Sequence, residues 1–372
     1  MPGIAHPPFP DDVPTVPLIV VDYALIKAGD QQEIDRLWKA ATELGFWYLK
    51  NHGADALAEQ MFQMGEETMD LPLEEKMKYE QGDGGMSFGY KYAGANAVDE
   101  TGAQDVVEFI NVSKDDALAW PKQAHRAYPS TVNVRMESTI TPFVKKSLEI
   151  NNTILSVLGD RLGLPKGALG EKHLLEEYSG SETRVIKTPP RPDIPADKAT
   201  LGAHTDFGSL SFLHNRLGGL QVLPPGADGW KYVKPYPGHA ICNIGDALAI
   251  FSGGILRSNL HRAVCVRFPL LFLCPHLPTN STPPKAQNAF TRWSLVFFTR
   301  PNFSAVLEPL AEQSEMVRDA AAKAEGKYNT GTTAKDWFAR RVKNQRVNNR
   351  TAGDGYVLHR PGLANIFVCT GP

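Results

Sequence analysis

Short stretches of strand-forming residues dominate the second half of this chain and constrain its fold more than any other feature. Each stretch is rich in β-branched and aromatic residues and is bounded by glycine, proline or aspartate, which favour turns. Eight such stretches follow one another between residues 183 and 301: TRVIKTP, LGAHTD, LSFLHN, GLQVLP, GWKYVKP, HAICNIGD, ALAIFS and RWSLVFFTRP. This pattern predicts a jelly roll, or double-stranded β-helix, in which two sheets face each other.

Helices are predicted mainly outside this strand-rich part. Apolar residues at helical spacing predict helices over residues 30–45, 55–69, 71–79 and 129–163, and one more over residues 333–346. One strand is predicted before the first helix, at residues 17–23, and two more lie between later helices, at residues 46–51 and 105–113. We therefore expect an α+β protein with an N-terminal region of helices and strands (1–180), a jelly-roll core (181–305) and a C-terminal helical extension (306–372).

The composition argues against several classes of protein. The formal net charge of the 372 residues is −2, which gives no sign of a nucleic-acid or anionic-membrane surface. The four cysteines form no CxxC pair, so we expect neither a disulfide framework nor a structural zinc site. No apolar stretch reaches membrane-spanning length, and the N-terminus lacks the apolar centre of a signal peptide. A cytoplasmic protein without nucleic-acid or membrane partners is expected.

The predicted strand LGAHTD places two metal-binding side chains on one face. His204 and Asp206 are separated by one residue, and alternate residues of a strand point to the same side. His261, in RSNLHRAV, follows several predicted strands later and is the candidate third ligand. Two histidines and one carboxylate form the facial triad of non-haem Fe(II) oxygenases, which leaves positions open for a cosubstrate and O₂. By itself the pair also fits surface residues or hydrogen-bonded core residues, so its context has to decide.

An arginine on a later strand favours the metal interpretation. Arg292 and Ser294 alternate with Trp293 in RWSLVFF, so both side chains face one side of the predicted strand. A cation on a strand that lines a barrel needs an anionic partner. A dicarboxylate cosubstrate supplies one, because a guanidinium binds a carboxylate through two hydrogen bonds while the serine hydroxyl adds a third.

The chain resembles the isopenicillin N synthase-like family of 2-oxoglutarate/Fe(II)-dependent dioxygenases over nearly its whole length. The blocks that carry the resemblance are VPLIVVDY, ELGFWYLKNHG, LPLEEKMKY, HTDFGSLSFL, GGLQVL, GWKYVKPYPGHAICNIGD, RSNLHRAV and RWS. The resemblance implies that His204, Asp206 and His261 bind iron and that Arg292 and Ser294 bind the 5-carboxylate of 2-oxoglutarate. It further implies an enzyme that uses Fe(II), 2-oxoglutarate and O₂, with ascorbate as an accessory reductant. Such an enzyme oxidises a C–H bond of a small molecule by hydroxylation, desaturation or ring closure and releases succinate and CO₂.

Two features depart from the family pattern. Where many members have a tyrosine that contacts the cosubstrate, this chain has TRVIKTPP, in which Lys187 either reaches a carboxylate or is a solvated residue at a strand end. The second departure is the segment CVRFPLLFLCPHLPTNS (265–281), which lengthens the connection between His261 and Arg292. Its uncharged apolar run FPLLFLC is unusual for a loop. We interpret the segment either as a lid over the substrate entrance or, slightly favoured, as a translated in-frame intron.

Other residues receive supporting or structural interpretations. We expect Asn243 to support the metal ligands, Asp246 to stabilise a turn and Phe207 either to line the substrate pocket or simply to pack. The histidines that we expect not to be ligands are His52, His214, His239 and His276. Two other functions stay open, namely an iron oxidase that does not use 2-oxoglutarate and a non-catalytic binding protein on the same fold. The sequence makes no prediction about oligomeric state.

Overall fold

Two sheets form the centre of the protein. The computed structural model describes residues 7–98, 102–190, 199–264 and 286–349. In these ranges an eight-stranded sheet has the order β1-β2-β10-β7-β12-β5-β4-β3 and a four-stranded sheet the order β6-β11-β8-β9, while β13 and β14 pair separately. The strands are β1 (Ile19–Asp22), β2 (Phe46–Lys50), β3 (Gly89–Lys91), β4 (Glu108–Ser113), β5 (Glu182–Thr188), β6 (Ala199–His204), β7 (Leu210–Asn215), β8 (Leu220–Val222), β9 (Lys231–Tyr232), β10 (His239–Ile244), β11 (His261–Val264), β12 (Arg292–Thr299), β13 (Val306–Leu307) and β14 (Thr332–Thr333).

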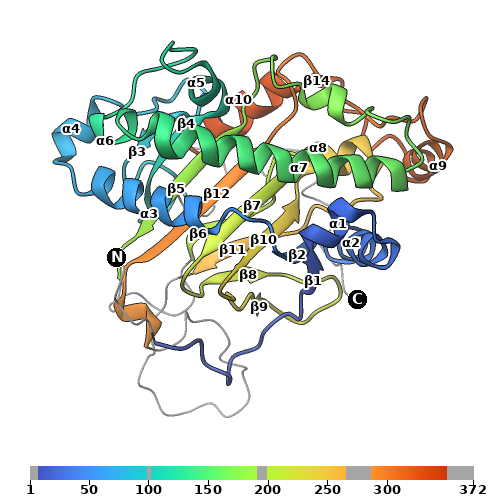
Figure 1. Ribbon diagram of the computed structural model, residues 1–372, viewed down its shortest axis with the longest axis horizontal. Coiled ribbons are helices and arrows are strands. Elements are labelled where there is room, and N and C mark those ends of the chain that lie inside the picture. The colour runs from blue at the N-terminus through green and yellow to red at the C-terminus, as the bar shows by residue number, and fades with distance from the viewer. Residues whose placement is uncertain (1–6, 99–101, 191–198, 265–285, 350–372) are drawn as a thin grey trace.

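Helices cover one face of the eight-stranded sheet. The long helix α7 and the helix α3 lie across this face and contact β5, β7 and β12 (Figure 1). The helices are α1 (Tyr23–Ala28), α2 (Gln31–Glu43), α3 (Asp55–Met69), α4 (Leu73–Met77), α5 (Lys114–Ala119), α6 (Ser130–Asn133), α7 (Thr141–Arg161), α8 (Asp246–Phe251), α9 (Glu315–Lys323) and α10 (Ala334–Gln345). The described ranges also contain a π-helical turn (Met136–Ile140) and three 3₁₀ turns (Gly170–His173, Gln287–Ala289 and Val347–Asn349).

Strict alternation along the strands gives this sheet two different faces. Trp47, Phe212, Cys242 and Leu295 are buried in the core that the sheet forms with the helices. Their neighbours along the same strands point to the opposite face, where several line a cavity. The eight-stranded sheet therefore packs against the helices with one face and lines the cavity with the other.

The N-terminal strands extend the sheet of the predicted jelly roll. β1 pairs with β2 in parallel, β2 pairs with β10, and β4 joins β5 to β3. The helix predicted over 30–45 is α2; Oδ1 of Asp30 caps it by accepting a hydrogen bond from the backbone N–H of Glu33 at 2.9 Å. Gly45 follows with φ of +77°, and a Cβ there would overlap the carbonyl oxygen of Arg257. The division of the chain at residues 180 and 305 stays a prediction.

The jelly-roll prediction is confirmed, but one of the eight predicted strands is wrong. The stretch ALAIFS forms helix α8 (Asp246–Phe251), whose six residues are all buried. A short apolar run that is buried on every side shows no period, so its pattern cannot separate a strand from a helix. Alanine and leucine favour the helix.

Two further sequence predictions concern membrane insertion and the apolar insertion. In the ranges that the structure describes, no helix combines the length and the hydropathy needed to cross a bilayer. The segment 265–281 lies outside the described residues.

Candidate active site

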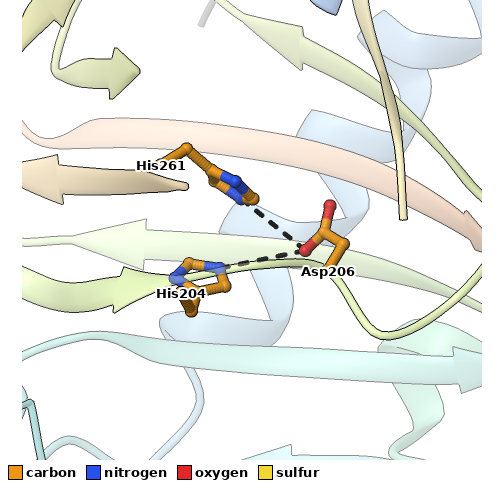
Figure 2. Close-up of side chains that lie close together, drawn as sticks. All are labelled: His204, Asp206 and His261. Atoms are coloured by element: carbon orange, nitrogen blue, oxygen red, sulfur yellow. Dashed lines mark ion pairs between the residues drawn. The ribbon is translucent and has the colours of Figure 1, made fainter. Parts of the chain in front are cut away.

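Three side chains predicted to bind metal come together at the edge of the cavity. β6 ends at His204 and β11 begins at His261, and the two residues are directly opposite each other in the antiparallel pair. Asp206 follows two residues after the end of β6. Its Oδ1 lies 3.8 Å from Nε2 of His204 and 3.6 Å from Nε2 of His261. Figure 2 shows both histidine rings turned toward this carboxylate. The candidate ligand atoms lie within 4.8 Å of one another, which suits a single ion.

Backbone carbonyls orient both imidazole rings. Nδ1 of His204 lies 2.8 Å from the carbonyl oxygen of Gly202, and Nδ1 of His261 lies 3.2 Å from that of Asn259. A carbonyl oxygen can only accept, so each Nδ1 carries a proton and each Nε2 is the nitrogen that faces Asp206 and is available to bind a metal. Burial, together with the nearby His261, lowers the pKa of His204 to about 4, which keeps that ring neutral at pH 7.

The two oxygens of Asp206 have different surroundings. Oδ2 accepts hydrogen bonds from Oγ of Ser211 at 2.5 Å and from Nδ2 of Asn243 at 2.8 Å, which leaves Oδ1 facing the histidines. Burial alone would raise the pKa of Asp206, but His261, His204 and the Asn243 hydrogen bond outweigh it and hold the pKa far below its usual range. The site therefore offers an ionised carboxylate between two imidazole nitrogens. The hydrogen bond from Asn243 is the kind of support for a metal ligand that the sequence predicted for this residue.

Helix α8 holds the loop that carries Asp206. Its first backbone N–H groups, from Asp246 and Ala247, donate to the carbonyl oxygens of Asp206 and Gly208 at 2.7 Å and 2.9 Å. A Cβ at Gly245 would overlap the backbone of this loop, so glycine is needed where the two segments meet. The incorrectly predicted strand is thus a helix that positions a candidate ligand.

The carboxylate of Asp246 connects this loop to the C-terminal helix. It accepts hydrogen bonds from the hydroxyls of Thr205 at 3.0 Å and Ser258 at 2.7 Å. Arg341, on α10, forms an ion pair with it at 3.2 Å and also donates to the carbonyl oxygen of Thr205. Asp246 was expected to stabilise a turn; the structure shows it joining three segments behind the candidate ligands.

Arg292 and Ser294 both line the cavity, as their alternation on β12 predicted. Nε of Arg292 donates to the carbonyl oxygen of Gly218 at 2.7 Å. Oγ of Ser294 is buried and has no hydrogen-bond partner among the described residues. A buried hydroxyl without a partner is unfavourable unless a ligand satisfies it. A guanidinium and a free hydroxyl on one cavity wall fit the carboxylate of a cosubstrate.

Lys187 lies on the other face of the sheet. Its Nζ is 3.5 Å from a carboxylate oxygen of Glu108 and 3.7 Å from one of Asp70, and it also lies over the ring of Trp293. The structure therefore supports neither a cosubstrate contact nor a fully solvated residue. The strand presents Arg184 and Ile186 to the cavity instead.

The cavity extends well beyond the three candidate ligands and is open to solvent. Together with the open solvent at its mouth it spans about 1180 Å³. Phe207 lines it, which selects the first of the two interpretations given above. Sequence reasoning did not identify Arg184, Arg300 or the end of α10 at Gln345 as parts of its wall. Alternation puts Arg184 on the same face of its predicted strand as Ile186, but the sequence does not say which face meets the cavity.

The histidines that were expected not to bind metal lie elsewhere, where the structure describes them. Nδ1 of His52 accepts a hydrogen bond from the backbone N–H of Ala54 at 3.1 Å, as expected of a turn residue. The rings of His52 and His214 pack together on the helix side of the sheet. His239 lies at the outer end of β10 beside Tyr236, and His276 is outside the described residues.

Comparison with known proteins agrees with this geometry. Residues 16–132 match the family model described as non-haem dioxygenase in morphine synthesis N-terminal, and residues 174–301 match that of the 2OG-Fe(II) oxygenase superfamily. A homoarginine-6-hydroxylase of Oryza sativa subsp. japonica is 30% identical over 80% of this chain and 89% of the relative. A 2-oxoglutarate-dependent dioxygenase of Aspergillus fumigatus is 29% identical over 91% of this chain and 92% of the relative.

A solved structure shows the same fold. A full-length Neurospora crassa protein, crystallised in complex with alpha-KG and 5-formyluracil, superposes with a TM-score of 0.68 at 19% identity, covering 91% of this chain and 99% of that one. Together, the fold, the His-Asp-His cluster and the matched families define a non-haem iron oxygenase. The chain belongs to the 2-oxoglutarate/Fe(II)-dependent oxygenase superfamily and is an enzyme whose cofactors are Fe(II) and 2-oxoglutarate, with O₂ as cosubstrate.

Proposed function

We propose that His204, Asp206 and His261 bind the catalytic Fe(II) and that Arg292 and Ser294 bind the distal carboxylate of 2-oxoglutarate. The single observation that carries this assignment is the convergence within 4.8 Å of one carboxylate oxygen and one ring nitrogen from each of two histidines. His204 and Asp206 come from the end of β6 and its loop, and His261 comes from β11. The buried hydroxyl of Ser294 on the cavity wall supports the cosubstrate part of the proposal, because the described protein offers it no hydrogen-bond partner.

When bound, Fe(II) and 2-oxoglutarate supply the oxidising power that attacks a substrate C–H bond, with release of succinate and CO₂. The chain's own contribution is positioning. His204, Asp206 and His261 would hold the ion at the cavity wall, and a triad of this kind leaves coordination positions for a cosubstrate and O₂. Arg292 neutralises the far end of the cosubstrate, and the apolar side chains of Ile186, Leu213 and Val296 on the same wall exclude water from it.

The proposed substrate is a small molecule, and the outcome is hydroxylation, desaturation or ring closure. The relatives support this size class: one is named for hydroxylating homoarginine, and the structural neighbour was crystallised with 5-formyluracil. We further propose that the enzyme works in the cytoplasm, since the described cysteine, Cys242, is a buried free thiol. Ascorbate is proposed only as a reductant that keeps the iron ferrous.

Succinate formation tests the proposal. Purified protein supplied with Fe(II), 2-oxoglutarate and O₂ should form succinate slowly without prime substrate, and His204→Ala, Asp206→Ala and His261→Ala should each abolish it. His239→Ala is the matched control, because that ring lies away from the cavity, and it should retain wild-type rates. Iron-dependent product formation without any requirement for 2-oxoglutarate would point to an oxidase, and absence of metal binding would point to a binding protein.

A further inference from the structure

The cavity has a second cationic position, on β5. Arg184 lies between Val296 of β12 and Asn111 of β4 in the sheet register, with its side chain on the cavity face. Nε donates to Oδ1 of Asn111 at 2.7 Å, and Nη2 donates to Oε1 of Glu182 at 2.9 Å. The remaining nitrogen, Nη1, makes no hydrogen bond to the described protein. The guanidinium is therefore held firmly on two sides with one nitrogen left for a ligand.

The charge around Arg184 is not balanced by the described residues. Glu182 is fully buried and also accepts a hydrogen bond from Nη2 of Arg300 at 3.1 Å. Two guanidiniums thus share one carboxylate, and Nε of Arg300 is buried without a partner. A buried excess of positive charge is costly unless a ligand brings an anion.

This position is separate from the proposed cosubstrate site. Arg184 pairs with Val296, which lies four residues beyond Arg292 along β12, or about 13 Å at the usual rise of a strand. Its hydrogen bonds to Asn111 and Glu182 further direct the guanidinium toward β4 and the start of β5. A carboxylate held by Arg292 and Ser294 therefore lies away from Arg184, whose anionic partner in the described protein, Glu182, is shared with Arg300.

Aromatic rings lie against the guanidiniums of Arg184 and Arg300, which share the carboxylate of Glu182. The Arg184 guanidinium lies 4.1 Å from the ring centre of Phe109 and 5.1 Å from that of Phe298. Arg300 lies 5.0 Å from the ring of Phe207 and 4.9 Å from that of Phe338 of α10. These rings restrict movement of the cations and give this end of the cavity an apolar wall.

We propose that Arg184 binds a carboxylate of the prime substrate, whose apolar or aromatic body packs against Phe109 and Phe298, which also line the cavity. One carboxylate matches the single excess charge of Arg184, Arg300 and Glu182. The substrate class is therefore a small organic acid with an apolar body. This inference rests on the proposed function, because it assigns the substrate of that same cavity.

Binding to the intact enzyme, measured by calorimetry with Fe(II) and 2-oxoglutarate in the absence of O₂, tests the inference apart from turnover. The probes are matched pairs of an acid and its primary amide: 3-phenylpropanoate, indole-3-propanoate and octanoate with their amides. A charge-assisted hydrogen bond in a desolvated site should favour the acids by roughly tenfold to a hundredfold. In Arg184→Gln this preference should disappear, and in Arg184→Lys part of it should remain.

Controls separate this inference from the underlying function. Arg262→Gln removes another cavity arginine, one held by Gln221 and the ring of Trp230, and should retain the wild-type preference. The affinity of each variant for 2-oxoglutarate checks that the variant is folded. Arg184→Gln does not leave a buried unpaired carboxylate, because Arg300 still neutralises Glu182. Equal binding of acids and amides, or no binding of any acid at millimolar concentration, refutes the inference. Failure of the wild-type protein to bind 2-oxoglutarate refutes the proposed function instead.

Discussion

Nδ2 of Asn243 donates a hydrogen bond to Oδ2 of Asp206 at 2.8 Å, while Oδ1 of the same carboxylate faces His204 and His261. β10 carries the asparagine and the loop after β6 carries the aspartate, so the contact joins the two sheets of the jelly roll. The amide thereby selects which carboxylate oxygen is presented to a metal.

The first prediction concerns this contact. Asn243→Ala should weaken Fe(II) binding by about 10- to 100-fold, because partners that orient a ligand typically contribute that much to metal affinity. Anaerobic titration of the apo-protein with Fe(II) measures the effect, and thermal unfolding checks the fold. Asn243→Asp should weaken binding further, since a second carboxylate would repel Asp206. Wild-type affinity in both variants would show that the hydrogen bond does not position the ligand.

The second prediction distinguishes Arg292 from Lys187. Arg292→Ala should raise the KM for 2-oxoglutarate much more than the KM for the prime substrate. Loss of a charged partner from a desolvated site costs about 2–5 kcal/mol, or roughly 30- to several-thousand-fold. Lys187→Ala should leave the KM for 2-oxoglutarate unchanged, because Lys187 pairs with Glu108 and Asp70 on the opposite face. A larger effect from Lys187 than from Arg292 would reverse the assignment.

The third prediction concerns acid stability and His173. This ring is buried between the carbonyl oxygen of Leu169 and the hydroxyl of Ser209, each 2.7 Å away, and burial lowers its pKa to about 4. The folded pKa lies below the unfolded value of 6.5, so the unfolded chain binds more protons between these pH values. The resulting contribution to stability is complete above about pH 6.5 and falls as the pH drops toward 4.

Urea unfolding of the apo-protein at pH 7.5 and pH 5 measures this contribution. His173→Gln should reduce the pH-dependent loss in the free energy of unfolding by about 2 kcal/mol, because glutamine does not titrate. His239→Gln, at the outer end of β10, is the matched control and should leave the loss unchanged. Identical pH dependence in His173→Gln and the wild type would mean that His173 is protonated or exposed in the folded state.

The fourth prediction concerns the insertion 265–281. If it is a translated intron, the transcript in the native source should lack the corresponding codons, and a protein without these residues should keep its activity. If it is a lid, deletion should impair turnover while iron binding is retained. A peptide from the native source that includes Phe268–Pro275, detected by mass spectrometry, would disprove the intron interpretation.

The jelly roll and the core of the site could be predicted because their signals are local. The spacing of His204 and Asp206 and the alternation of Arg292 with Ser294 follow from the geometry of single strands. The same short-range logic gave the helices with clear caps, such as α2 after Asp30. His261 also fits, since β11 brings it opposite His204, but its pairing required the resemblance to a family to be recognised.

Other features depend on contacts between distant segments, and only the tertiary structure decided them. Arg184 and Lys187 are three residues apart on β5, so they point to opposite faces, and the sequence does not say which face meets the cavity. The run ALAIFS has no period, and its helical form is stabilised by N–H groups that hold the Asp206 loop. Arg341 of α10 forms an ion pair with Asp246, although the two residues are 95 positions apart in the sequence. Local sequence preferences cannot predict such contacts, because the residues next to each partner in the sequence are the same whether or not the contact forms.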